Sequence, residues 1–178
     1  GWPLEALKVL GKVSTGGTPP GGRDGMFGGS IPFLTPGDLE SDLPAKRTVT
    51  ESGAEHAVTV RAGAALVCCI GATIGKSDIA IQRSAFNQQL NAVDWSSSID
   101  DIYGLMALRA LKPIIISRGA STTMPILKKS SFEQLQICVP PLPLQQTFAT
   151  RIASIEALKA THRRALAALQ QRAFAGQL

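Results

Sequence analysis

Hydrophobic positions follow two different patterns along the chain of 178 residues. From Leu144 to Phe174 they recur every three or four residues, which is the spacing of one face of an α-helix. At ~1.5 Å per residue, this stretch predicts a helix of roughly 46 Å. A helix of this length extends past the surface that a small domain covers, so we expect a second helix to pack along it. Its apolar face carries Leu144, Phe148, Ile152, Ile155, Leu158, Leu166, Leu169 and Ala173.

The first 140 residues instead show short hydrophobic stretches separated by glycine, proline and polar turns. Residues 4–13 predict a short helix or strand, and residues 102–111 predict a helix that extends toward Ile116 with Pro113 disturbing it. Strands are predicted at residues 31–34, 57–60, 64–70, 78–81, 88–93 and 134–139. We therefore expect an α+β fold, with a mixed α/β domain over residues 1–140 and one long helix within residues 141–178.

The positive charge lies mainly on the predicted helix. The chain has 18 Lys and Arg against 13 Asp and Glu, a formal charge of +5. Residues 1–140 hold 13 against 12 and residues 141–178 hold 5 against 1, so +4 of the total belongs to the helix. A basic chain can bind nucleic acid, but this distribution gives that function only weak support.

Hydrophobicity and cysteine usage indicate the cellular compartment in which we expect the protein. No apolar run approaches the ~20 residues of a membrane span, and no secretory signal is visible at the N-terminus. Cys68, Cys69 and Cys138 form no C-x-x-C pair, so we expect free thiols in a reducing cytoplasm. The histidines, His56 and His162, stand alone in the sequence, and no metal site is expected.

Residues 71–77 (GATIGKS) resemble a phosphate-binding loop only in part. Three residues rather than four separate the glycines, and a strand-like sequence follows where a helix is needed. We expect a tight turn from which Lys76 projects outward. The sequence also has no G-x-S-x-G, no H-E-x-x-H and no methyltransferase tetrapeptide of the Asn-Pro-Pro-Tyr kind. These patterns favour a binding protein without catalytic residues or a cofactor.

Polar loops that contain or adjoin glycine are the remaining candidates for a binding site. They cover residues 16–20, 28–38, 71–77, 86–89 and 118–125. Asn and Gln amides read adenine edges, Arg and Lys read guanine or contact phosphate, and Thr contacts phosphates or thymine methyl groups. The alternative is that Asn87 and Gln88 satisfy buried backbone groups at the start of a strand. Both interpretations stay open at this point.

Seven short motifs follow one another along nearly the whole chain. They are WPL (2–4), GGTPP (16–20), GGSIPFLTPGDL (28–39), LVCCIGATIGK (66–76), FNQQ (86–89), GASTTMP (119–125) and VPPLPLQQ (139–146). In this order they resemble the target recognition domain of type I restriction–modification specificity subunits. The predicted C-terminal helix, which ends in residues 172–178, looks like the helical spacer that follows such a domain.

The resemblance implies a division of labour. A specificity subunit of this family holds two recognition domains, separated by two long antiparallel helices, and each domain reads one half of a split DNA target. Modification subunits supply the adenine methyltransferase, and restriction subunits supply the ATP-driven translocase and nuclease. The resemblance therefore implies a non-catalytic subunit that directs these partners to a bipartite site on double-stranded DNA.

The sequence departs from the family pattern chiefly in length, because it has one recognition domain and one long helix. Met26-Phe27 stands where an aromatic pair is frequent, and Phe33 stands where Trp is usual. We expect a homodimer whose helices pair as an antiparallel coiled coil, with a split palindrome as target. A piece of a longer subunit and a monomer are the alternatives. A further alternative is an assembly half-subunit that binds DNA specifically only with its modification partner, which the near-neutral charge of residues 1–140 favours.

The residues expected to contact DNA lie in loops that recur in the family pattern. They are Thr18, Arg23, Lys76, Asn87, Gln88, Thr122 and Thr123, with Arg118 as a phosphate partner. The residues expected at the helix–helix interface are Phe148, Ile152, Ile155, Leu158, Leu166 and Leu169.

Overall fold

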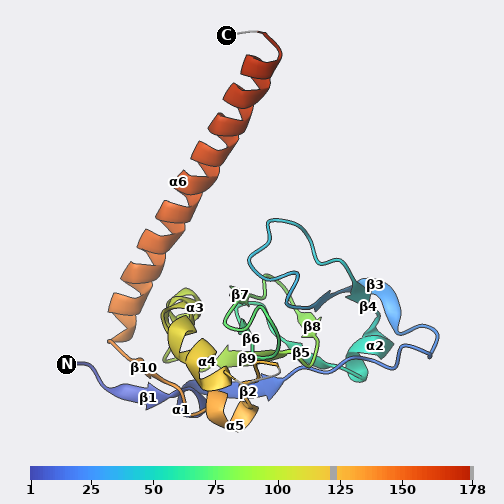
Figure 1. Ribbon diagram of the computed structural model, residues 1–178. Helices are drawn as coiled ribbons and strands as arrows, with labels where there is room; N and C mark the ends of the chain where they lie inside the picture. The colour runs from blue at the N-terminus through green and yellow to red at the C-terminus, as the bar shows by residue number, and fades with distance from the viewer. Residues whose placement is uncertain (121–123, 177–178) are drawn as a thin grey trace.

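A computed structural model describes residues 1–120 and 124–176, which form a mixed α/β body and a long C-terminal helix (Figure 1). The strands are β1 (Leu4–Ala6), β2 (Gly11–Thr15), β3 (Phe27–Leu34), β4 (Thr48–Val49), β5 (Val58–Val60), β6 (Ala65–Cys68), β7 (Ser77–Ile79), β8 (Ser84–Phe86), β9 (Leu90–Trp95) and β10 (Gln136–Cys138). The helices are α1 (Leu7–Leu10), α2 (Glu51–Glu55), α3 (Asp101–Ala110), α4 (Lys112–Gly119), α5 (Lys129–Phe132) and α6 (Leu142–Phe174).

A central antiparallel sheet with the order β2-β9-β6-β7 holds the main core. Side chains of β6 alternate between two hydrophobic clusters, since Val67 packs with α3 and α5 residues while Leu66 packs with Phe86 and Leu90. Burial of both faces explains why residues 64–70 form a continuous apolar run rather than an alternating one.

A second sheet, with the order β4-β3-β8-β5, forms with α2 a lobe that we call the outer lobe (Figure 1). Strands β3 and β8 pair in parallel, and Phe33 and Ala85 from these strands lie in its core. Residues 28–34 therefore belong to a strand, and only the last part of the candidate loop at 28–38 is a loop. No helix of the described residues is long and apolar enough to cross a membrane.

All six predicted strands are confirmed in position, with their ends shifted by a few residues. Residues 4–13 form a strand, a single helical turn and a second strand, which the sequence left undecided. The helix predicted over residues 102–111 is α3, and the Asp100 carboxylate accepts hydrogen bonds from the backbone N–H groups of Ile102 and Tyr103. Pro113 lies in the first turn of a separate helix, α4, because proline is tolerated there.

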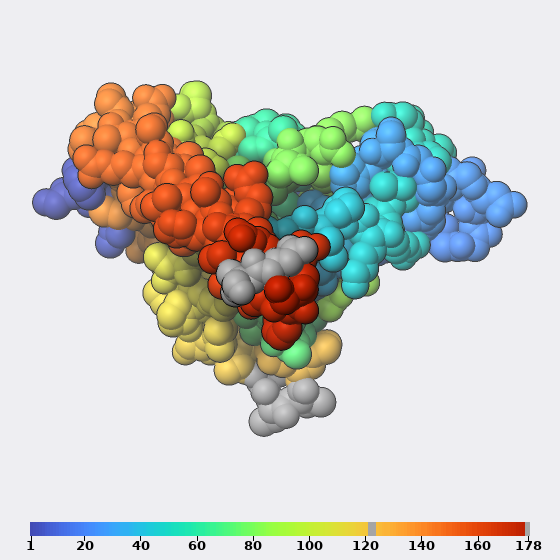
Figure 2. All heavy atoms as spheres, turned by 90° about the horizontal axis from the view of Figure 1, so that it is seen from above, coloured from blue at the N-terminus to red at the C-terminus, as the bar shows by residue number. Residues whose placement is uncertain are grey.

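The long helix α6 has 33 residues, about 50 Å at ~1.5 Å per residue, and confirms the predicted helix over 144–174. Its first turns lie against α3, where the rings of Phe148 and Tyr103 meet edge to face at 5.8 Å. Further along, Arg163 donates to Asp42 of the loop between β3 and β4 at 3.2 Å. Viewed from above, the helix passes over the body from the β1–β10 side (Figure 2).

One buried amide fixes the start of this helix. Gln145 is 0% exposed, and its Oε1 accepts a hydrogen bond from the Asp100 backbone N–H at 2.9 Å. Its Nε2 donates to the carbonyl oxygens of Ser98 at 3.1 Å and Pro140 at 2.8 Å. The side chain therefore joins α6 to the segment before α3 and satisfies three backbone groups.

Replacing this amide tests its structural role. Gln145→Leu leaves three backbone groups without partners, so we expect a loss of about 3 kcal/mol of stability in urea unfolding. Gln146→Leu is the matched control, because Gln146 is exposed, and its unfolding midpoint should stay close to the parent value. Equal midpoints for the two variants would contradict the assigned role.

Candidate nucleic-acid interface

Two of the predicted loops meet at the end of β2. The backbone N–H of Gly16 donates to the Leu90 carbonyl at 3.1 Å, and that of Gly17 donates to the Phe86 carbonyl at 3.0 Å. Beyond them, the Thr18 hydroxyl donates to Gln88 Oε1 at 2.7 Å. Two predicted DNA-contacting residues, separated by 70 positions in sequence, therefore form one exposed pair.

Asn87 lies beneath this pair and shapes the turn that carries it. Its side chain is 8% exposed, and its Oδ1 accepts from the backbone N–H of Gln89 at 3.1 Å. Its Nδ2 donates to the side-chain Oε1 of Gln89, also at 3.1 Å. The amide of Asn87 thus satisfies local groups, which is the alternative raised from the sequence, while Gln88 faces solvent.

A third predicted loop is joined to the same edge by backbone pairing. Cys69 donates to the Gln89 carbonyl at 2.8 Å and accepts from the backbone N–H of Leu127 at 2.8 Å. Gly71 donates to the Pro125 carbonyl at 2.9 Å. Four segments that are far apart in sequence therefore converge beside the Thr18–Gln88 pair. They are residues 16–18, 69–71, 86–89 and 125–129.

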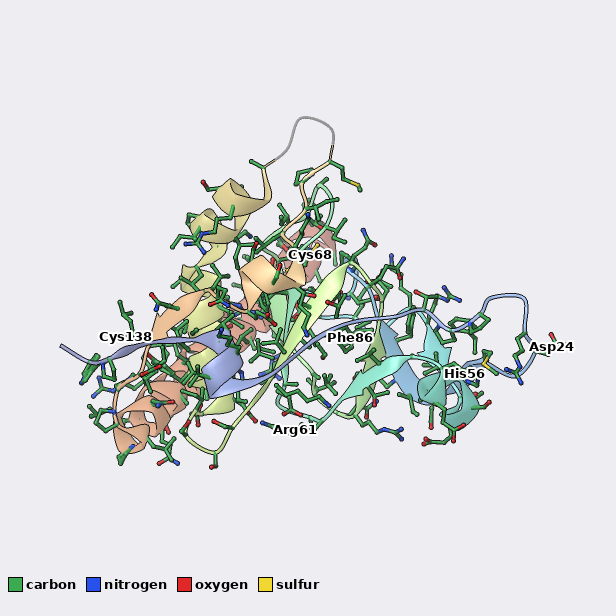
Figure 3. All side chains as sticks on the ribbon, turned by 90° about the horizontal axis from the view of Figure 1, so that it is seen from below. Asp24, His56, Arg61, Cys68, Phe86 and Cys138 are labelled. Atoms are coloured by element: carbon green, nitrogen blue, oxygen red, sulfur yellow. The ribbon has the colours of Figure 1, made fainter. Side chains whose placement is uncertain are left out.

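Arg23 is not part of this convergence. It belongs to the outer lobe, where its Nη1 lies 3.2 Å from Nε2 of His56. The Nδ1 of His56 lies 2.9 Å from the Ser52 carbonyl, so Nδ1 donates and Nε2 accepts from the guanidinium. Figure 3 shows His56 and Asp24 at the far end of the lobe, well separated from Phe86.

Arg118 is exposed near the end of α4, on the approach to residues 121–123. Thr122 and Thr123 lie outside the described residues.

Lys76 occupies a different place from the one expected. The turn at 71–76 joins β6 to β7 with Gly71 and Gly75 at positive φ, and a strand follows it. The prediction of a tight turn followed by a strand is confirmed. The prediction that Lys76 projects outward is wrong, because its half-buried amine donates to the Leu39 carbonyl at 3.0 Å and so supports the loop after β3.

A charged cluster away from the Thr18–Gln88 pair was not anticipated from the sequence. Arg61, which is labelled in Figure 3, contacts Asp94 through Nε at 2.7 Å and Asp101 through both terminal nitrogens at 2.8 Å. Hydrogen bonding to Asp101 is the main cause that raises the pKa of Arg61 above its ordinary value. The cluster ties β5, β9 and α3 together, and nothing in the sequence distinguishes Arg61 from other surface arginines.

Comparison with known proteins assigns the chain to a family. Residues 1–171 match the family model described as the type I restriction modification DNA specificity domain. The chain belongs to this family. No group of acidic, histidine or cysteine side chains that could hold a metal ion is found among the residues described.

Two curated specificity subunits of type I restriction enzymes are similar in sequence. The HindI specificity subunit of Haemophilus influenzae is 24% identical, with 87% of this chain and 35% of that protein covered. The MjaIX specificity subunit of Methanocaldococcus jannaschii is 26% identical, with coverage of 84% and 36%. The chain thus spans about a third of the length of these relatives.

Solved structures of type I subunits share the fold. The HsdS subunit from Thermoanaerobacter tengcongensis superposes with a TM-score of 0.69 at 22% identity, over all of this chain and 46% of that one. A structure described for the assembly and conformational transition of a type I system gives 0.70 at 22% identity, over 47% of that chain. The S subunit from M. genitalium gives 0.65 at 12% identity, over 88% and 39%.

Two neighbouring glycines, Gly16 and Gly17, provide a test of the close packing between the loop after β2 and the loop at residues 86–89. A Cβ at Gly16 would collide with the carbonyl oxygens of Phe86 and Asn87, whereas a Cβ at Gly17 would meet nothing within 4 Å. We expect Gly16→Ala to lower the free energy of unfolding by about 1–3 kcal/mol, because the two loops must separate. Gly17→Ala should change it by less than about 1 kcal/mol. Urea unfolding measures both, and equal effects would refute the packing described.

Proposed function

We propose that this chain is the DNA-reading half of a type I specificity subunit, without a catalytic site of its own. It directs modification and restriction subunits to a bipartite site on double-stranded DNA. Family membership supports this proposal, and the convergence of the family loops around one exposed polar pair is the observation that carries it. The three free cysteines agree with work in the cytoplasm, where thiols stay reduced.

The Thr18–Gln88 pair has the chemistry for direct base readout. Because Oε1 of Gln88 is occupied by the Thr18 hydroxyl, the Gln88 Nε2 is left as a donor and the Thr18 oxygen as an acceptor. An adjacent donor and acceptor complement N7 and the N6 amino group of adenine in the major groove. We assign base reading to this pair and a positioning role to Asn87.

The other residues of the proposed interface surround this pair at greater range. Arg118 is an exposed cation and suits a phosphate. Arg23 extends the interface to the outer lobe, where His56 holds its guanidinium. Thr122 and Thr123 belong to the proposal on the sequence pattern, and Lys76 contributes by fixing the loop after β3.

The exposed face of α6 supports pairing with a second helix. Five large apolar side chains on this face are each about half exposed, and Phe148 is somewhat less exposed. The five are Leu144, Ile155, Leu158, Leu166 and Leu169. Ile152 is half-buried. This face is interrupted at His162, between Leu158 and Leu166. An apolar surface of this extent on a helix of ~50 Å needs a cover. We propose that this cover is a second copy of this chain in antiparallel orientation.

Such a dimer sets the form of the target. Two-fold symmetry gives two identical half-sites in inverted order, so the target is a split palindrome. The helix exceeds one turn of DNA, which is ~34–36 Å, and leaves room for an unread spacer between the half-sites.

Charge substitutions on the helix test the partner. Ile155→Glu combined with Leu166→Glu places two carboxylates in the proposed interface, so light scattering should report the mass of one chain instead of two. Ala153→Glu, on the opposite side of α6 by helical periodicity, is the control and should leave the dimer intact. A dimer that persists in the double variant would show that the helix face is not the interface.

Methylation mapping tests the function and the base-reading pair together. The chain is produced with its modification subunit, and the methylated sites in cellular DNA are sequenced; we expect one split motif. Gln88→Ala should lower methylation of that motif at least about tenfold, the effect of losing one good base contact. Gln82→Ala, an exposed amide in the outer lobe, should not. An unchanged motif and rate in Gln88→Ala would remove the pair from the interface.

A further inference from the structure

The exposed side of α6 contains a narrow line of positions that a paired helix would contact directly. Their spacing alternates between three and four residues, as at the centre of a coiled coil. All of them are exposed, so a second helix can reach them. The six central positions, which we call the seam, are Phe148, Arg151, Ile155, Leu158, His162 and Ala165.

Two of the six seam positions are polar. Neither the Arg151 nor the His162 side chain forms a hydrogen bond or an ion pair within the described part of the chain. Covering a polar side chain without giving it a partner costs free energy. The helix that covers the seam must therefore be polar opposite these two positions and apolar opposite the other four.

The seam fits an inverted copy of itself. From Leu144 to Leu169 the steps are four, three, four, three, four, three and four residues, which is the same series in both directions. An antiparallel copy whose two-fold axis lies midway between Ile155 and Leu158 therefore places an apolar residue opposite each apolar position, with a large Phe opposite a small Ala. The apolar pairs are Ile155–Leu158, Phe148–Ala165 and Leu144–Leu169.

The same axis brings the two polar positions together. Arg151 of one copy lies opposite His162 of the other, and symmetry repeats the pair. A neutral imidazole accepts a hydrogen bond from a guanidinium, and the outer lobe already contains such a pair, in which Arg23 lies 3.2 Å from His56. Two basic helices can thus pair without placing one cation opposite another in the seam, although residues 141–178 carry 5 Lys and Arg against 1 Glu.

Other antiparallel alignments lose this match. A slip must cover a whole heptad to keep the steps of three and four in phase. A slip of one heptad places Arg151 opposite Ile155 in one direction and opposite Leu169 in the other, and in both cases His162 faces a leucine. The two polar positions therefore favour one alignment over its neighbours, as single polar residues do in other coiled coils.

We propose that α6 pairs with α6 of a second copy in this alignment, and that the contact between Arg151 and His162 selects it. This assignment rests on the proposed homodimer. At ~1.5 Å per residue, it places the two starts of α6, at Leu142, roughly 44 Å apart along the helix axis. A slip of one heptad would change that separation by about 10 Å, or about three base pairs. The alignment thus sets the length of the unread spacer between the half-sites.

A carboxylate in the seam tests the alignment, because its effect depends on what lies opposite. The dissociation constant of the dimer is measured by sedimentation equilibrium on the full chain at pH 8. His162→Glu places a carboxylate opposite Arg151 twice, so the dissociation constant should fall at least about threefold, the effect of two exposed ion pairs. Leu169→Glu is the control with the same change of net charge. Its carboxylate faces Leu144, so the dissociation constant should rise about tenfold or more.

Removing the cation opposite should reverse the gain. In an Arg151→Met background, His162→Glu places its carboxylate against an apolar side chain, so the substitution should weaken the dimer instead of strengthening it. Weaker association of His162→Glu in the parent background would overturn the alignment, as would a gain that persists in the Arg151→Met background. Equal effects of His162→Glu and Leu169→Glu would also overturn it. A parent chain that stays monomeric at all concentrations would instead refute the proposed homodimer itself.

Discussion

The buried amide of Gln145 is the constraint on which the arrangement of this molecule depends. A helix of about 50 Å extends from a small α/β body. A small change in its direction at the first turn therefore becomes a large displacement at its far end. Two hydrogen bonds from this side chain, to Ser98 and Asp100, hold that start against the segment before α3, and a third, to Pro140, fixes the chain where it enters α6. The Tyr103–Phe148 contact and the Arg163–Asp42 ion pair add support further along the helix. Because the Asp42 pair is exposed, we attribute little stability to it.

This anchoring relates the two surfaces that matter for the proposed function. The proposed DNA-reading edge is built on the central sheet, whose strands β6 and β9 are buried on both faces. The apolar face of α6 is held to the same body through Gln145. A partner helix on that face would place a second reading edge at a fixed distance and orientation. A fixed relation between the two surfaces is what a split target with a defined spacer requires.

The sequence predicted the elements better than their contacts. The long helix and α3 were predictable because each has strong periodicity or a clear Asp cap, and the strands were predictable from β-branched runs. The division into separate sheets was not, since the pairing of β3 with β8 joins segments some 50 residues apart. The family motifs indicated Thr18 and Gln88 as candidates, but their hydrogen bond across 70 positions was invisible. The inward roles of Lys76, Asn87 and Gln145 depend on burial, which local sequence patterns do not specify for polar side chains.

In the proposed dimer, two copies of one reading edge, held by their helices, engage two separated half-sites. Hydroxyl-radical footprinting of the complex between this chain and its modification subunit on a duplex with the methylated motif tests it most directly. The proposed dimer should protect two segments of equal length, in inverted order, with their centres at least about one DNA turn apart. One contiguous protected segment would contradict it.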